Sequence, residues 1–135
     1  MPIIPGLYDN LAIIRRWYAT RDPALLDEAV DWVMADGFPV GGHYRGSRTV
    51  LEVWWPKLMA VFSEWRAAPE RFLSAGEAVV TLGRYDATVR HSGERLSVPF
   101  THVWWLRHGR IAGLEQQTDT ALIARALAGR LSLAA

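Results

Sequence analysis

The sequence predicts an α+β domain in which helices pack on one face of a curved antiparallel sheet. In the first half of the chain, apolar residues recur every three or four positions, which is typical of amphipathic helices. From Glu70 onward the apolar period changes to two, which is typical of strands that bury one face. Helices early in the chain and an antiparallel meander late in it therefore predict a single domain over residues 1–135.

Helical spacing organises the first segment, and a short hairpin follows it. Leu11, Ile14 and Tyr18 share one side of a predicted helix, while Arg15 and Arg16 take the polar side. The next residues contain a helix-starting Asp-Pro pair, an alternating apolar run and a cluster of turn formers. The predicted elements are a helix at about 6–20, a short helix from 22 to about 27 or 28, a strand at about 29–34, a turn at 36–42 and a strand at 43–45.

A third helix is predicted to begin at Ser47, which serves as its N-cap. Pro56 lies inside this helix, so we expect it to kink the helix or to divide it, with Pro56 starting the second piece. The apolar face is predicted to consist of Leu51, Trp54, Leu58, Val61 or Phe62, and Trp65.

The second half of the chain is predicted to form a meander of four strands and a final helix. Glycine-containing turns separate the strands, as expected for hairpins. The helix is expected to end at Gly129. The predicted strands are 71–75, 79–90, 94–107 and 110–118, and the predicted helix is 120–127.

The composition excludes several classes of protein. The chain has 15 basic and 14 acidic residues and a formal net charge of +1, so no excess charge is available to bind nucleic acid or an anionic membrane. It contains no cysteine, which rules out disulfides and thiolate chemistry, and its four histidines lack zinc-like spacing. We therefore expect no metal and no cofactor. No apolar run reaches about 18 residues and the N-terminus does not resemble a signal peptide, so we expect a cytoplasmic protein without a membrane span.

Three motifs resemble a known family. They are Phe-Pro-Val-Gly-Gly-His-Tyr-Arg-Gly at 38–46, Val-Pro-Phe-Thr-His-Val-Trp at 98–104 followed by His-Gly-Arg-Ile at 108–111, and Gln-Gln-Thr-Asp-Thr-Ala at 116–121. Together with the order of elements, they resemble the SnoaL-like branch of the NTF2-like superfamily over about residues 7–127. This branch includes polyketide cyclases and is related to ketosteroid isomerases and limonene-epoxide hydrolases. The resemblance implies a cone-shaped barrel, in which the sheet wraps around the N-terminal helices and leaves a deep apolar pocket.

Three ionisable residues are candidates for acid–base catalysis. His102 shares a strand face with Phe100 and Trp104, and the resemblance implies that this face lines the cavity; the alternative is a core histidine paired with a neighbour. Asp119 follows the last strand, in the region where the cyclase branch carries a carboxylate, but it would also serve as a helix N-cap. Asp36 ends the first strand, as the base of ketosteroid isomerases does; the alternative is a solvated turn residue.

The activities of the two related enzymes do not transfer to this sequence. Tyr18 could match the helix-one tyrosine of ketosteroid isomerases, but no acid occupies the inward positions of 98–106. The Asp–Arg–Asp relay of limonene-epoxide hydrolases is also missing, because Arg107 has the opposite strand parity from His102 and a second buried aspartate is lacking.

Aromatic side chains are the main candidates for ligand binding, because they offer flat apolar faces to a ring-shaped molecule. The adjacent strand is expected to bring either Gln117 or Glu115 near His102, and Gln117 would orient the ligand. Trp55, Trp65 and Trp105 are expected on the outer sides of their elements. The predicted ligand-binding residues are Trp17, Tyr18, Trp32, Tyr44, Trp54, Trp104 and Gln117.

An apolar patch on the outer sheet face predicts a homodimer. Thr101, Val103 and Trp105 share the strand face opposite to His102, and a patch of this kind is typical of a dimer interface.

Three functions agree with these patterns. The first is a cofactor-free acid–base enzyme acting on a small hydrophobic carbonyl, enol or epoxide compound, with His102 and Asp119 exchanging protons with the substrate. The second is a non-catalytic protein that binds a small apolar ligand. The third is a structural dimerisation module whose cone is filled by its own side chains, which requires that no pocket exist.

Overall fold

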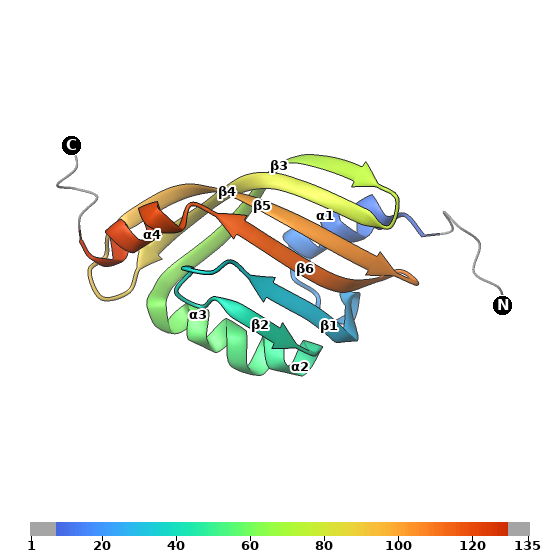
Figure 1. The fold of residues 1–135 in the computed structure, drawn as a ribbon, viewed down its shortest axis with the longest axis horizontal. Helices are drawn as coiled ribbons and strands as arrows, with labels where there is room; N and C mark the ends of the chain where they lie inside the picture. Colours follow the sequence, from blue (N-terminus) through green and yellow to red (C-terminus); the bar gives the residue numbers. More distant parts are fainter. Residues whose placement is uncertain (1–7, 130–135) are drawn as a thin grey trace.

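The computed structural model describes residues 8–129, and its strands form one curved six-stranded sheet (Figure 1). The strands are β1 (Leu26–Met34), β2 (Gly42–Arg45), β3 (Phe62–Ala75), β4 (Ala78–Val89), β5 (Arg95–Arg107) and β6 (Arg110–Thr118). They lie in the order β2-β1-β6-β5-β4-β3, and all neighbours are antiparallel except β1 and β6, which are parallel. The sheet is curved, as expected. It does not close into a complete barrel, because β2 and β3 are free edges.

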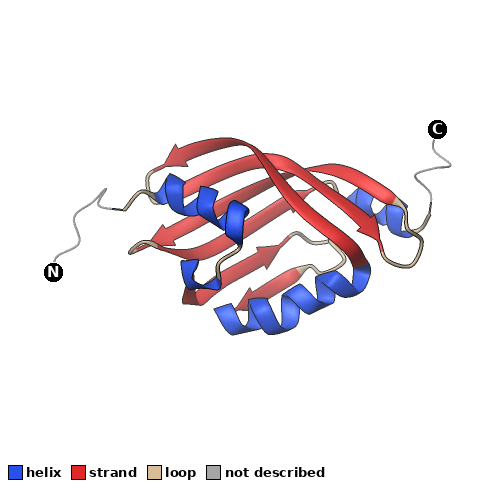
Figure 2. Cartoon of the chain, turned by 180° about the vertical axis from the view of Figure 1, so that it is seen from behind, coloured by secondary structure: helices blue, strands red, loops and turns tan. Residues whose placement is uncertain are grey.

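Helical segments flank this sheet. They are α1 (Asn10–Thr20), the 3-10 turn η1 (Pro23–Leu25), α2 (Ser47–Thr49), the π-helical turn η2 (Val50–Trp54), α3 (Trp55–Val61) and α4 (Thr120–Leu127). Figure 2 shows α1 and the continuous run from α2 to α3 lying across the same face of the sheet. In the described part of the chain, no helix is long and apolar enough to cross a bilayer.

Helix α1 begins at Asn10, four residues after the predicted start at Gly6. The carboxylate of Asp9 accepts a hydrogen bond from the backbone N–H of Ala12 and so caps the helix. The helix ends at Arg21, whose backbone is left-handed with φ of 50°. The predicted helical residues Gly6 and Leu7 lie outside the described residues.

The third predicted helix divides at Pro56, as expected, but it is shorter than its apolar spacing indicated. Pro56 lies in the first turn of α3, directly after the π-helical turn η2. The helix stops at Val61, so the prediction that Trp65 lies on it is wrong. From Phe62 onward the chain pairs with β4, and this long-range ladder overrides the local helical spacing.

The remaining elements agree closely with the prediction. Strand β1 begins earlier than predicted because the second predicted helix is only the single turn η1. Strands β4 and β5 begin or end within one residue of the predicted bounds, and β6 and α4 match them. The inward side of β5 is buried as the alternation predicted; these residues are Val98, Phe100, His102, Trp104 and Leu106.

The register shifts at four places in the ladders of the sheet, and two of these matter for the site and for the sheet edge. Between β5 and β6, Trp105 pairs with Gly113 and Leu106 pairs with Ile111, so Ala112 is an extra residue in β6. In the edge strand β3, the register with β4 shifts between Pro69 and Arg71.

Gly83 of β4 leaves room for the ring of Phe100, its partner on β5. A Cβ atom on Gly83 would lie 2.6 Å from Phe100 Cζ and would also collide with the backbone oxygen of Ala68. Phe100 in turn stacks on His102, with ring centroids 4.0 Å apart. The absence of a side chain at Gly83 therefore allows the packing beneath the histidine.

We expect Gly83→Ala to lower the free energy of unfolding by about 3 kcal/mol, because a backbone oxygen and a packed ring must both move. Urea denaturation measures this loss. Gly113→Ala is the matched control: it is another strand glycine, its nearest neighbour would be 3.4 Å away, and it should cost less than about 1 kcal/mol. Equal losses for the two variants would contradict the steric explanation.

Candidate functional site

A cavity of about 290 Å³ lies between the inner face of the sheet and the helical segments α1, η2 and α3. This volume is at the lower end of the range for small-molecule sites. Its existence contradicts the dimerisation-module hypothesis, which required a cone filled by its own side chains. The lining residues are Trp17, Tyr18, Arg21, Trp32, Met34, Val50, Leu51, Trp54, Trp55, Trp65, Ala67, Tyr85, His102, Trp104 and Leu114.

Tryptophan dominates the cavity wall. The rings of Trp17, Trp54 and Trp104 all meet Trp32 edge to face, with ring centroids 5.4–5.9 Å apart. Among the residues predicted for the site, Trp17, Tyr18, Trp32, Trp54, Trp104 and His102 line the cavity.

Two tryptophans expected on the outside also line the cavity. Trp65 does so because it lies on strand β3 and not on the helix. Trp55 follows the π-helical turn, whose wider spacing changes the phase of the helix, so that the consecutive residues Trp54 and Trp55 both reach the cavity. Trp105 is on the outside as predicted; its side chain is 47% exposed and donates to Glu115 Oε2 at 2.9 Å.

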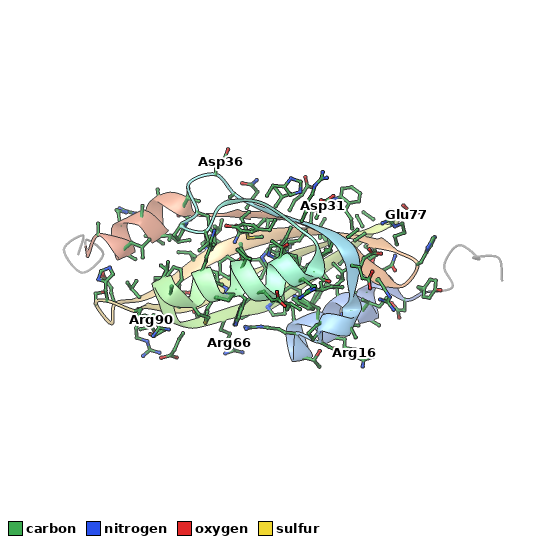
Figure 3. All side chains as sticks on the ribbon, turned by 90° about the horizontal axis from the view of Figure 1, so that it is seen from below. Arg16, Asp31, Asp36, Arg66, Glu77 and Arg90 are labelled. Carbon is green, nitrogen blue, oxygen red and sulfur yellow. The ribbon has the colours of Figure 1, made fainter. Side chains whose placement is uncertain are left out.

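Neither predicted catalytic aspartate lines the cavity. Asp119 is exposed and caps α4 by accepting a hydrogen bond from the backbone N–H of Leu122 at 3.0 Å. Asp36 is exposed in the turn after β1, and Figure 3 shows its side chain pointing away from the helices. Both predicted cavity positions are therefore wrong, because each carboxylate takes the local role that its turn or helix start offers.

Tyr44 also lies outside the cavity, contrary to the prediction. Its strand, β2, is at the edge of the sheet, and its hydroxyl donates to the backbone oxygen of Gly41 at 3.2 Å. The ammonium group of Lys57 lies 5.7 Å from the centre of its ring.

Gln116, and not Gln117, takes the buried position beside His102. The extra residue Ala112 shifts the parity of β6, so that Gln116 pairs with His102 and is 2% exposed while Gln117 is exposed. The prediction for Gln117 is therefore wrong by one residue. A sequence alone does not show a bulge of this kind.

A chain of hydrogen bonds crosses the polar side of the cavity. The hydroxyl of Tyr18 lies 2.6 Å from His102 Nδ1, and the hydroxyl of Tyr85 lies 2.5 Å from His102 Nε2. Gln116 Nε2 donates to the Tyr85 hydroxyl at 2.8 Å, and the backbone N–H of Ala35 donates to Gln116 Oε1 at 3.2 Å. Both ring nitrogens of the histidine are therefore occupied by tyrosines.

The donor and acceptor atoms of these groups fix the direction of each hydrogen bond in this series. A backbone N–H only donates, so Oε1 of Gln116 faces Ala35 and its Nε2 donates to Tyr85. Tyr85 is 3% exposed, so its proton needs an acceptor, and it donates to His102 Nε2. A neutral imidazole then carries its proton on Nδ1, which donates to the Tyr18 oxygen.

Tyr18 is the end of this chain and faces the cavity. Its oxygen accepts from His102 Nδ1 and also from Trp104 Nε1 at 2.9 Å. With two donors directed at its oxygen, Tyr18 donates its own proton to a further acceptor, which is either the neighbouring hydroxyl of Thr81 or an oxygen atom in the cavity that it lines.

Burial keeps all three ionisable groups of the chain neutral near pH 7. It lowers the pKa of His102 to about 3 and raises the pKa values of Tyr18 and Tyr85 well above the usual 10. The chain therefore acts as a set of neutral hydrogen-bond donors. It does not offer a free base, because both nitrogens of His102 are already paired.

The other polar atoms on the cavity wall are donors too. The indole N–H groups of Trp32 and Trp54 are buried and lack a hydrogen-bond partner within residues 8–129. Arg21 contributes a guanidinium group, and no carboxylate is among the lining residues that the structure describes. A cavity wall with side-chain donors and, among the described residues, no carboxylate suits a ligand with oxygen acceptors.

The sequence analysis missed Tyr85, Gln116 and Arg21. A signal for Tyr85 existed, because it lies between the polar residues Arg84 and Asp86 on a predicted strand and so falls on the inward parity. No sequence pattern distinguishes Arg21 from the other arginines. Within the described residues, no cluster of histidine and carboxylate side chains could hold a metal ion.

Both the sequence and the fold are similar to those of known proteins. The sequence profile of the SnoaL-like domain matches residues 14–114, which include most of the cavity wall. No protein of curated function matches the sequence.

Three solved structures are similar over nearly their whole lengths. An NTF2-like protein of unknown function from Burkholderia pseudomallei is 30% identical, with a TM-score of 0.80 over 87% of this chain and 96% of that chain. An NTF2-like protein from Burkholderia thailandensis is 29% identical, with a TM-score of 0.78 over 87% and 93%. TerC, co-crystallised with polyporic acid, is 25% identical, with a TM-score of 0.79 over 88% and 98%. The expected NTF2-like fold is confirmed.

Acid should destabilise the protein through His102. Below about pH 6.5 the unfolded chain binds a proton at this residue, whereas the folded chain does not until about pH 3. The free energy of unfolding should therefore fall as the pH decreases through this range, by up to about 1.4 kcal/mol per pH unit from this group.

Urea titrations between pH 4 and 7 measure this slope. His102→Gln should reduce it, and His91→Gln, which removes an exposed histidine, should leave it as in the wild type. Parallel slopes for the wild type and His102→Gln would contradict a neutral buried imidazole.

Proposed function

Because the chain belongs to the family of SnoaL-like domains, we propose that it binds a small, flat, hydrophobic carbonyl or enol compound and catalyses proton transfer on it without a cofactor. The observation that carries this proposal is the hydrogen-bond chain that ends at Tyr18 inside a cavity lined mostly by aromatic and aliphatic side chains. The reaction type is an enolisation, as in an isomerisation or a cyclisation.

Tyr18 supplies the electrophilic half of this reaction. When a carbon next to a carbonyl loses a proton, the electron pair moves onto the carbonyl oxygen. A donor that is already oriented stabilises this oxygen more than the neutral ground state. The N–H groups of His102 and Trp104 hold the Tyr18 oxygen in place, so its proton meets the ligand without reorganisation.

The tryptophan rings supply the binding energy. They form an apolar wall with edge-to-face geometry, into which a flat ring system fits by stacking and by exclusion of water. TerC, which resembles this chain along its length, was crystallised with polyporic acid, and that supports a small organic ligand here.

A second candidate function is a non-catalytic ligand-binding protein. It is favoured by one observation: the described cavity wall contains no carboxylate, and His102 has no free nitrogen to accept a proton from carbon. In the enzyme, this proton therefore goes to water or to a basic oxygen of the ligand. In the binding protein, the proton stays on the carbon atom of the ligand.

Deuterium exchange into the methyl group of 2-acetylnaphthalene distinguishes the two candidates. The wild-type protein should bind this ketone and accelerate exchange in D₂O, followed by proton NMR, because a hydrogen bond to the oxygen promotes enolisation. Tyr18→Phe should reduce the exchange rate of the complex about 100-fold, as expected when one oxyanion donor is lost, and weaken binding less than about tenfold.

Tyr44→Phe is the matched control, since it removes a hydroxyl that lies outside the cavity. It should leave both binding and exchange unchanged. Binding without acceleration would reject the enzyme and support the binding protein, and failure of the ketone to bind would reject both.

We also propose that the outer sheet face forms a homodimer. Trp105 is large and half exposed there, and Thr101 and Val103 are only partly buried beside it. Trp105→Arg should convert a dimer to a monomer in light scattering, because the interface would bury an unpaired charge. A wild-type protein that is monomeric at high concentration would contradict this proposal.

A further inference from the structure

Arg21 lies at the mouth of the cavity. Of the described residues that line the cavity, only Arg21 and Leu51 are exposed to solvent, so these two mark the side on which it opens. Arg21 follows the last turn of α1, three residues after Tyr18. A ligand that reaches Tyr18 inside the cavity therefore enters past a positive charge.

Contacts with two other elements hold the guanidinium group across this mouth. The left-handed backbone at Arg21 directs the chain out of the helix, and the backbone N–H still donates to Trp17 O at 2.7 Å. The guanidinium carbon lies 4.8 Å from the ring centre of Trp55 on α3, and Nη2 donates to the backbone oxygen of Trp65 on β3 at 3.2 Å.

The charge of Arg21 is not neutralised by the protein. Within residues 8–129, no carboxylate lies within ion-pair distance of its guanidinium. The neighbouring Asp22 accepts a hydrogen bond from the backbone N–H of Ala24 and lies 3.9 Å from Arg16 instead. Burial also lowers the pKa of Arg21, which shows that its position carries a desolvation cost without a compensating anion.

A guanidinium has five N–H donors in a planar fork, and within the described part of the chain only Nη2 has a protein acceptor. A carboxylate matches this fork geometrically and supplies the missing negative charge. Among the ion pairs of the described residues, the other arginines that pair do so on the surface, away from the cavity; these are Arg16, Arg45, Arg48 and Arg107.

We propose that Arg21 binds an anionic oxygen group of the ligand, of the carboxylate type, at the mouth of the cavity. The ligand is then an amphiphilic acid, with a flat apolar body among the tryptophans, a carbonyl oxygen at Tyr18 and its charge at Arg21. This inference deepens the proposed function and rests on it for the position of the carbonyl group. It assigns Arg21 as a residue that determines specificity.

Two probes that differ only in charge test this assignment. They are 2-acetylnaphthalene and 6-acetyl-2-naphthoic acid, which share a flat body and an acetyl group, and their Kd values are measured by calorimetry. The wild type should bind the acid at least about tenfold more tightly than the ketone, because a charge-assisted hydrogen bond in a partly dry site contributes that much. Higher salt should reduce this preference.

Arg21→Gln removes the charge but keeps an amide that can donate to Trp65 O. It should abolish the preference for the acid while changing the Kd of the ketone less than about twofold. Arg16→Gln is the matched control: it removes the same charge from α1 at a residue that does not line the cavity, and the preference should persist. Urea denaturation of each variant reports folding.

Each outcome decides between the two proposals. Equal affinity for acid and ketone in the wild type, or a preference that persists in Arg21→Gln, overturns the anion site and leaves the enolisation proposal standing. A preference that depends on Arg21, without deuterium exchange that depends on Tyr18, supports the anion site and rejects the enzyme. If neither probe binds at about 1 mM, both proposals are rejected.

Discussion

The backbone N–H of Ala35 can only donate a hydrogen bond, and the direction of every hydrogen bond from Gln116 to Tyr18 depends on this constraint. It orients the amide of Gln116, which orients the hydroxyl of Tyr85, which places the proton of His102 on the nitrogen that faces Tyr18. An imidazole buried among rings is thereby fully paired without a carboxylate. The residue that follows β1 thus determines, through four groups, which proton faces a ligand in the cavity.

Much of the fold was predictable because strand alternation and turn residues act locally. The inward residues of β5 and the bounds of β6 and α4 follow from these patterns alone. The segment around Trp65 was not predictable in this way, because its helical spacing is real but Trp65 pairs with Ala87 of β4, which is 22 positions away. A short stretch of sequence does not reveal a strand partner at that distance.

Sequence patterns predicted a residue's position in the site where the buried face of a helix or strand decides it, as for His102 and Tyr18. They failed where one extra residue or a competing hydrogen-bond partner decides it. Ala112 reverses the parity of β6 without any unusual residue type, and so exchanges the roles of Gln116 and Gln117. A carboxylate before a helix meets a backbone N–H nearer than any cavity, which is why Asp119 caps α4.

The open sheet has a long edge strand, β3, and the sequence of that strand affects the tendency of copies of the protein to aggregate. An unpaired edge of fourteen residues is a template on which a strand of another molecule could form a ladder and start aggregation. Pro69 lacks the N–H that such a ladder needs, and the register shift beside Arg71 bends the strand. Glu64 and Arg66 add exposed charges along the same edge. The free edge of the sheet is therefore a poor site for recruiting strands from neighbouring copies.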